Sequence, residues 1–127
     1  MIRISILIVS IVSFFYGSIF LFFPGWFIDL SKAEHINVAW LRNIGASIIG
    51  ILFFGCLSIY YKPRGKKTLF KIISITSILQ TFALIFSRYS NEFSAKNLVL
   101  IDLTIFLAVF ICIYFVVILI YKIEQFK

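Results

Sequence analysis

The first long apolar stretch of the chain, residues 4–23, contains no charged side chain. An α-helix needs about 20 predominantly apolar residues to cross the roughly 30 Å hydrocarbon core of a bilayer. Residues 38–60, 68–87 and 98–121 form further stretches of this kind. Because none of them alternates between apolar and polar residues as a barrel strand does, we expect helices. The sequence therefore predicts an all-α membrane protein with four transmembrane helices.

The composition excludes a water-soluble domain. Of the 127 residues, 62% are hydrophobic and only 13% are charged, about half the charged share of a soluble domain. The length suits a single domain, residues 1–127, which we expect to be an antiparallel bundle with short links. No A-x-A-like cleavage site follows the first stretch, so we expect it to be retained as a span and not removed as a signal peptide.

Lysine and arginine residues are unevenly divided between the two ends of the predicted spans. One side holds eight of them: Arg3, Lys62, Arg64, Lys66, Lys67, Lys71, Lys122 and Lys127. The other side holds four: Lys32, Arg42, Arg88 and Lys96. The positive-inside rule predicts that both termini are cytoplasmic, and we expect a bacterial cytoplasmic (inner) membrane. Topology thus accounts for the net charge of +7, and nucleic acid is not an expected partner.

The links between the spans differ in character. Residues 26–37 are amphipathic, and Trp26, Phe27 and Ile36 predict a short helix that lies on the membrane surface. Residues 61–67 are basic and contain Pro63 and Gly65, which predicts a tight turn between the second and third spans.

A group of polar side chains is expected at one depth. Counting about 20 residues along the spans places Arg42, Arg88 and Asp102 near the outer hydrocarbon boundary, with Asn43 beside Arg42. Each residue can simply mark a helix end, because arginine snorkels and aspartate suits a helix N-terminus. A carboxylate at this depth gains from a cation, so we expect Asp102 to pair with Arg42 or with Arg88. A charge-selective binding pocket at this cluster is a further interpretation.

Small residues predict where membrane helices approach each other closely. Ala46 and Gly50 form a small-xxx-small pair next to Gly45, and Ser13 and Gly17 form a similar pair in the first span. We expect these residues to pack inside the bundle. An interface between two copies of the chain is the alternative.

The third span carries a row of polar residues, namely Ser74, Thr76, Ser77, Gln80 and Thr81. Gln80 is expected near the middle of the membrane, where an amide has to face protein or trapped water. An interhelical hydrogen bond is the simpler interpretation of Gln80. A contact with a substrate is the alternative.

Motifs for catalysis and metal binding are missing. The sequence holds no G-x-S-x-G, no H-E-x-x-H, no phosphate-binding loop and no pair of acids at mid-depth. Cys56 and Cys112 lie in apolar stretches and are predicted to be free thiols, while His35 has no second histidine to share a metal or haem. We therefore expect no enzyme, no cofactor and no metal.

The order of these features resembles the small four-span bacterial membrane proteins classed as domains of unknown function. An uncharged first span precedes a Pro24–Gly25 break, the second span opens with R-N-I-G-A, and the third ends with F-S-R-Y-S. The resemblance implies a four-helix fold and no particular activity. Small multidrug transporters and fluoride channels are disfavoured, because the mid-span glutamate of the former and the polar mid-span break of the latter have no counterpart here.

The function that we expect is that of a non-catalytic structural or accessory subunit, held in a membrane complex or a homo-oligomer and surrounded by membrane lipid. The alternative is a small carrier or binding protein for a lipid-like or ionic ligand, which would use the polar cluster and Gln80. An immunity-type protein that shields a membrane target is a third interpretation.

Overall fold

The computed structural model describes residues 2–34 and 38–126. The elements are α1 (Ile2–Phe22), α2 (Pro24–Ser31), α3 (Val38–Ser47), η2 (Ile48–Phe53), α4 (Phe54–Tyr61), α5 (Lys67–Tyr89), α6 (Leu98–Tyr121) and η3 (Ile123–Phe126). In this part of the chain, four helices are long and apolar enough to cross a membrane, and α3, η2 and α4 together make up one of them. The prediction of an all-α chain with four such helices is confirmed, and their ends lie within two residues of the predicted spans.

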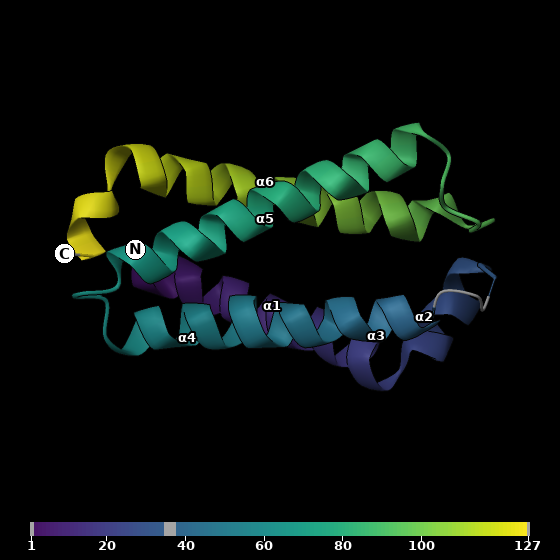
Figure 1. Cartoon of the computed structure of the whole chain (residues 1–127), viewed down its shortest axis with the longest axis horizontal. Helices are drawn as coiled ribbons and strands as arrows, with labels where there is room; N and C mark the ends of the chain where they lie inside the picture. Colours follow the sequence, from purple (N-terminus) through teal and green to yellow (C-terminus); the bar gives the residue numbers. More distant parts are fainter. Residues whose placement is uncertain (1, 35–37, 127) are drawn as a thin grey trace.

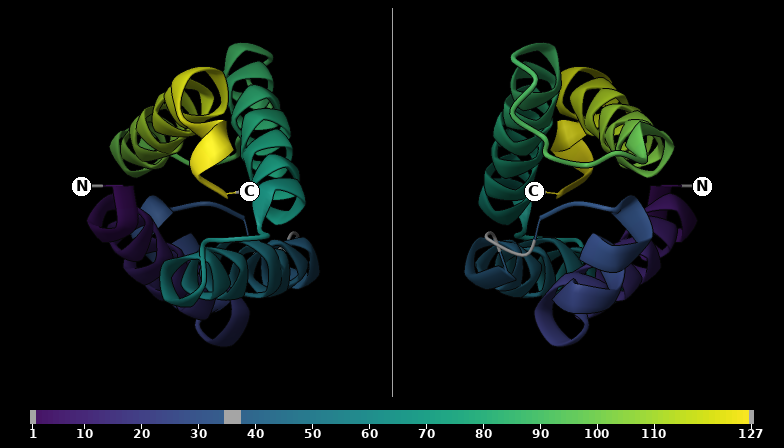
Figure 2. Two further views of the ribbon diagram at one scale, coloured as in Figure 1. Left: turned by 90° about the vertical axis from the view of Figure 1, so that its left-hand side faces the viewer. Right: turned by 90° about the vertical axis from the view of Figure 1, so that its right-hand side faces the viewer.

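The long helices form two layers, each made of two helices (Figures 1 and 2). The first pair consists of α1 packed along α3, η2 and α4, and the second pair consists of α5 packed along α6. Between the pairs, α4 contacts α5 and α2 contacts α6. Both chain ends lie at one end of the long axis, which we call the terminal end, and α2 lies at the other, the α2 end (Figure 1).

An apolar core joins the two pairs at the terminal end. The ring of Phe70 packs against that of Phe115, with centroids 5.4 Å apart, and is stacked on that of Phe126 at 4.7 Å. Ile6 and Ile59 of the first pair are buried in the same cluster. The short helix η3 thereby folds back on α5, so the C-terminal residues close this end of the molecule.

Hydrogen bonds close the α2 end. The backbone N–H of Asn97 donates to the carbonyl of Ser31 at 3.0 Å, and its side-chain amide donates to the carbonyl of Leu30 at 3.3 Å. The N–H of Lys96 donates to the carbonyl of Lys32 at 3.3 Å. The end of α2 is therefore tied to residues 90–97, the link between α5 and α6.

The surface helix predicted over residues 26–37 is shorter and begins earlier. It starts at Pro24, whose fixed backbone angle and missing N–H suit the first turn of a helix. It ends before Lys32, whose left-handed conformation, with φ of 53°, stops the helix. Trp26 is exposed as expected, and Ile36 lies outside the described residues.

The middle of the second span is a π-helix, which the sequence did not predict. The N–H of Phe54 donates to the carbonyl of Ile49, five residues earlier. The buried hydroxyl of Ser10 on α1 donates to the carbonyl of Phe53 at 3.1 Å. The π-helix inserts an extra residue into its turn, so it changes which faces of α3 and α4 point inward.

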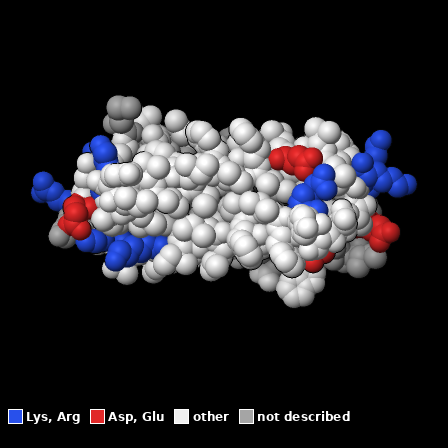
Figure 3. Space-filling model, turned by 90° about the horizontal axis from the view of Figure 1, so that it is seen from above, with Lys and Arg blue, Asp and Glu red and all other residues white. Residues whose placement is uncertain are grey.

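The outside of the two layers is apolar along most of its length. Phe82 on α5 and Phe106 and Val99 on α6 are among the exposed large side chains. Lysine, arginine and acidic residues gather towards the two ends of the molecule and leave a wide uncharged band between them (Figure 3). This band is the surface that hydrocarbon would cover.

Candidate functional site

A cavity of about 490 Å³ lies between the first and second pairs. Its deep end, at the middle of the long helices, is bounded by Ser13, Leu52 and Ser77. Its other end, towards the α2 end of the molecule, is bounded by Phe27 of α2 and by Phe93 of the link at residues 90–97. Along the long axis, the cavity thus lies between the core of the terminal end and the hydrogen bonds of the α2 end.

The lining of the cavity is mostly aliphatic and aromatic. Among the described residues that line it, none is charged, and the polar members are Ser13, Tyr16, Ser77, Gln80, Thr81, Ser87 and Thr104. The hydroxyl of Thr81 donates to the carbonyl of Ala108 at 3.3 Å, and that of Thr104 donates to the carbonyl of Leu100 at 2.9 Å. These two hydroxyls are thus satisfied by helix backbone and present mainly their methyl groups to a ligand.

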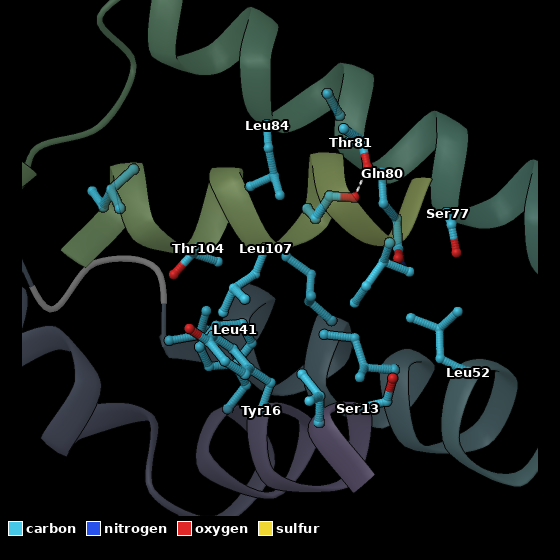
Figure 4. A pocket seen from close by; sticks show the side chains of 18 of the residues that line it. Ser13, Tyr16, Leu41, Leu52, Ser77, Gln80, Thr81, Leu84, Thr104 and Leu107 are labelled. Carbon is cyan, nitrogen blue, oxygen red and sulfur yellow. Dashed lines mark hydrogen bonds between the residues drawn. The ribbon is translucent and has the colours of Figure 1, made fainter. Parts of the chain in front are cut away.

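Ser77 and Gln80 project from α5 into the cavity (Figure 4). Only 5% of Ser77 is exposed, and its hydroxyl oxygen is buried without a hydrogen-bond partner among the described residues. One turn away on the same face, the hydroxyl of Ser74 donates to the carbonyl of Phe70 at 2.8 Å. The two serines therefore differ, because the hydroxyl of Ser74 is satisfied by its own helix, whereas the buried hydroxyl of Ser77 has no partner among the described residues.

The amide of Gln80 lies next to the Ser77 hydroxyl at mid-depth. Gln80 is nine residues from the end of α5 at Tyr89, which is roughly 13–14 Å along the helix. Its side chain forms no hydrogen bond with another described residue, so the interhelical bond predicted for Gln80 is not seen in this part of the chain. The interhelical bond at this level comes from its neighbour Thr81, and Gln80 remains available to a ligand.

The phenol of Tyr114 also has a hydroxyl buried without a partner among the described residues. Tyr114 packs against the core of the terminal end and is not part of the cavity lining. Nothing in the structure explains its unpaired hydroxyl.

The π-helix η2 forms part of the cavity wall. Ile48 and Leu52 line the cavity from this element, opposite Ser77 on α5. Short π-helical turns inside α-helices recur at functional sites, since they alter the direction of neighbouring side chains. The irregular part of the second span is therefore placed where the two pairs face each other across the cavity.

The polar cluster predicted at one depth is brought together only in part. The Nε atom of Arg88 lies 2.8 Å from Oδ1 of Asp102, and both side chains are partly exposed. Arg42 is exposed on α3 and makes no ion pair with any described residue, and Asn43 beside it is exposed as well. Of the two pairings predicted for Asp102, the one with Arg88 is confirmed. The one with Arg42 is not formed, because α3 belongs to the other pair, whereas residues 90–97 connect Arg88 and Asp102 directly.

This ion pair does not form a charge-selective pocket. None of the four residues Arg42, Asn43, Arg88 and Asp102 is among the described residues that line the cavity. The ion pair joins the end of α5 to the start of α6, the two helices of the second pair.

The small residues divide into an inner and an outer group. Gly17 of α1 faces Gly45 of α3, and a Cβ on Gly45 would lie 2.6 Å from the backbone nitrogen of Leu21. Ser13 is buried next to this contact and lines the cavity.

Ala46 and Gly50 lie on the exposed side of the second span, and a Cβ on Gly50 would meet nothing within 4 Å. The prediction that Ala46 and Gly50 pack inside the bundle is therefore wrong, because the contact uses Gly45.

The remaining candidate residues form no site in the structure. Cys56 is buried, Cys112 is half-buried, and both thiols are free. No group of three or more potential metal ligands occurs among the described residues. His35, the histidine considered for metal or haem binding, lies outside the described residues.

Several cavity residues carry no recognisable signal in the sequence. Ser77 belongs to the polar row of the third span, which does mark a face of that helix. Tyr16, Phe27, Phe93 and Ala108 look like any other residue of an apolar span or link, and only the packing of the two pairs brings them together.

The comparisons with protein-family models, curated proteins and solved structures gave no match to this chain. The resemblance to small four-span bacterial proteins of unknown function therefore stays a hypothesis.

Proposed function

We propose that the chain is a non-catalytic binding protein in the membrane, and that its cavity holds a lipid-like ligand. The cavity of about 490 Å³ between the two pairs carries this proposal. Ligand cavities in proteins usually measure about 300–1,000 Å³ and combine an apolar lining with a few polar groups. The cavity has both properties, with aromatic side chains at the α2 end and Ser77 and Gln80 at mid-depth.

The contacts at both ends of the molecule support a ligand that arrives from the lipid. The aromatic core around Phe70 occupies the terminal end, and the hydrogen bonds of Asn97 to α2 occupy the other. A ligand dissolved in the bilayer would enter sideways between the two pairs. This route suits a molecule that already resides in the membrane.

The proposal includes an orientation for the protein. We place the four long helices antiparallel across a bacterial inner membrane, with the termini in the cytoplasm, as the positive-inside rule predicts. The α2 end then faces outward, and the cavity occupies the outer half of the bilayer. Its ligand would be drawn from the outer leaflet of that membrane.

A cavity-filling substitution tests the proposal. Ala108 lines the cavity, whereas Leu103 on the same helix is 51% exposed. The wild type, Ala108→Phe and Leu103→Phe are purified in mild detergent, and the retained lipids are extracted and measured by mass spectrometry. We expect the wild type and Leu103→Phe to retain one lipid class at close to one molecule per chain, and Ala108→Phe to lose most of it, because the added ring occupies its place. Equal lipid content in all three proteins, in the proportions of the bulk membrane, would overturn the proposal.

An accessory subunit of a membrane complex is the second candidate function. The observation that favours it is the exposed side of the second span, where Arg42 and Asn43 lie close to Ala46 and Gly50. Polar side chains on a transmembrane helix usually face protein, and small residues allow close helix contact. A protein that co-purifies stoichiometrically with the wild type in the experiment above would support this function.

A further inference from the structure

We infer that the ligand carries an uncharged head group with a carbonyl or hydroxyl oxygen, and that this head lies at mid-depth against Ser77 and Gln80. The inference rests on the proposed function and adds the chemical class and direction of the ligand. The observation behind it is a polar spot, formed by Ser77 and Gln80, in the wall of a mostly apolar cavity, and the Ser77 hydroxyl has no partner among the described residues.

The unpaired hydroxyl of Ser77 favours a polar ligand group at this place. A hydroxyl that is taken out of water without a hydrogen bond destabilises a protein, and buried polar groups are almost always paired. The other buried hydroxyls that α5 presents to its surroundings, those of Ser74 and Thr81, donate to helix carbonyls. Ser77 departs from this pattern at the point where α5 faces the cavity (Figure 4).

The spot can donate hydrogen bonds to an oxygen of the ligand, and the hydroxyl oxygen of Ser77 and the amide oxygen of Gln80 can accept in return. Serine provides an O–H donor and glutamine provides an NH₂ group with two donors. Ser77 and Gln80 are three residues apart on one helix, so their side chains lie on neighbouring positions of one face. A single carbonyl oxygen, or the oxygen of a hydroxyl group, can accept from both side chains.

The absence of charge in the lining excludes an ionised head group at this place. No described residue that lines the cavity is charged, and a buried ion without a counter-charge is strongly unfavourable. A phosphate or a carboxylate therefore does not fit at the deep end. The apolar rest of the ligand would extend towards the α2 end, where Phe20, Phe27 and Phe93 offer aromatic surface.

The test compares two probes that share a tail. Decylubiquinone is uncharged and carries ring carbonyls, and decylbenzene has the same alkyl chain on a ring without oxygen. Each probe is titrated against delipidated protein in detergent, and bound stoichiometry is read by native mass spectrometry. We expect decylubiquinone to bind more tightly than decylbenzene, and dipalmitoyl phosphatidylglycerol to displace neither probe.

Substitutions of Ser77 and Gln80 test whether these two side chains cause the difference in affinity between decylubiquinone and decylbenzene. Ser77→Ala and Gln80→Leu should each weaken decylubiquinone binding by about 3- to 10-fold, the usual effect of one lost hydrogen bond, and leave decylbenzene unchanged. Ser74→Ala, one turn away and outside the cavity lining, is the matched control and should bind both probes like the wild type. Ser77→Ala should also raise the thermal midpoint of the ligand-free protein, because it removes an unpaired buried hydroxyl.

The outcomes separate this inference from the proposed function. Equal affinities of the wild type for both probes, with no effect of Ser77→Ala or Gln80→Leu, would overturn the inference and leave the lipid-binding function standing. Displacement of decylubiquinone by dipalmitoyl phosphatidylglycerol would also overturn it, in favour of a charged lipid. If Ala108→Phe binds both probes like the wild type, the cavity is not the binding site and the proposed function fails with it.

Discussion

Hydroxyl side chains of this protein donate hydrogen bonds to backbone carbonyls, some on a neighbouring helix and some on their own helix. Ser10 reaches from α1 to the carbonyl of Phe53, and Thr81 reaches from α5 to the carbonyl of Ala108. Interhelical hydrogen bonds of this kind stabilise membrane proteins by about 0.6 kcal/mol on average. Among the described residues, the buried hydroxyls without a partner are those of Ser77 and Tyr114, and of these two residues Ser77 lines the cavity.

Arg88 and Asp102 provide a residue-scale prediction. In a double-mutant cycle of Arg88→Leu and Asp102→Leu, we expect the double variant to lose less stability than the sum of the two single variants, because each single substitution leaves the other charge of this partly exposed pair without its partner. The matched cycle of Arg42→Leu with Asp102→Leu should show no coupling, because Arg42 lies on the other pair. Unfolding in a defined detergent provides the measurement, and additive losses in both cycles would contradict the pair.

The sequence predicts the existence and bounds of the long helices better than their inward faces. Twenty uncharged apolar residues suffice to define a span, whatever it packs against. The sequence does not predict which face of α6 points inward, because apolar residues occur on all sides of this helix and their pattern has no preferred direction. The π-helix at Ile48–Phe53 also changes which side chains of the second span point inward. The residues that line the cavity could therefore not be predicted from the sequence, whereas the polar row of α5 could.

The contact between α1 and α3 gives a prediction at the scale of elements. Gly45→Ala should destabilise the protein by about 1–3 kcal/mol, as overpacking does, because the new methyl group would meet the backbone of α1 at Leu21 and Gly17. Gly50→Ala is the matched control in the same span. It has open space around it, and alanine favours a helix by up to about 1 kcal/mol over glycine, so this variant should be neutral or slightly more stable. Thermal unfolding in detergent measures both, and equal effects of the two substitutions would contradict the close packing.

The whole molecule is asymmetric along its long axis. The terminal end is filled by the aromatic core around Phe70, Phe115 and Phe126, whereas the cavity occupies the half towards α2. The two pairs are therefore joined by an apolar core at the terminal end, and by backbone hydrogen bonds between α2 and residues 90–97 at the α2 end. The cavity therefore lies in the half of the molecule that is away from the aromatic core.

The direction in which this asymmetric molecule crosses the membrane determines which leaflet supplies the ligand. The imbalance of eight against four basic residues predicts that the terminal end is cytoplasmic. Single cysteines at Ser90 and Gln125, in a background with Cys56→Ala and Cys112→Ala, can report this direction. Both positions are exposed and uncharged, so the substitutions leave the distribution of lysine and arginine intact. They also avoid Asn91 and Gly65, whose positive φ angles would strain a cysteine.

In intact cells, we expect a membrane-impermeant maleimide to label Ser90→Cys, and to label Gln125→Cys only after permeabilisation. The reverse pattern would contradict the charge argument and move the cavity into the cytoplasmic leaflet, with its lining unchanged. Equal labelling of both positions would mean that the chain inserts in both directions. In that case the basic residues around Lys62 and Lys67 do not control insertion, and ligand from either leaflet would reach Ser77 and Gln80.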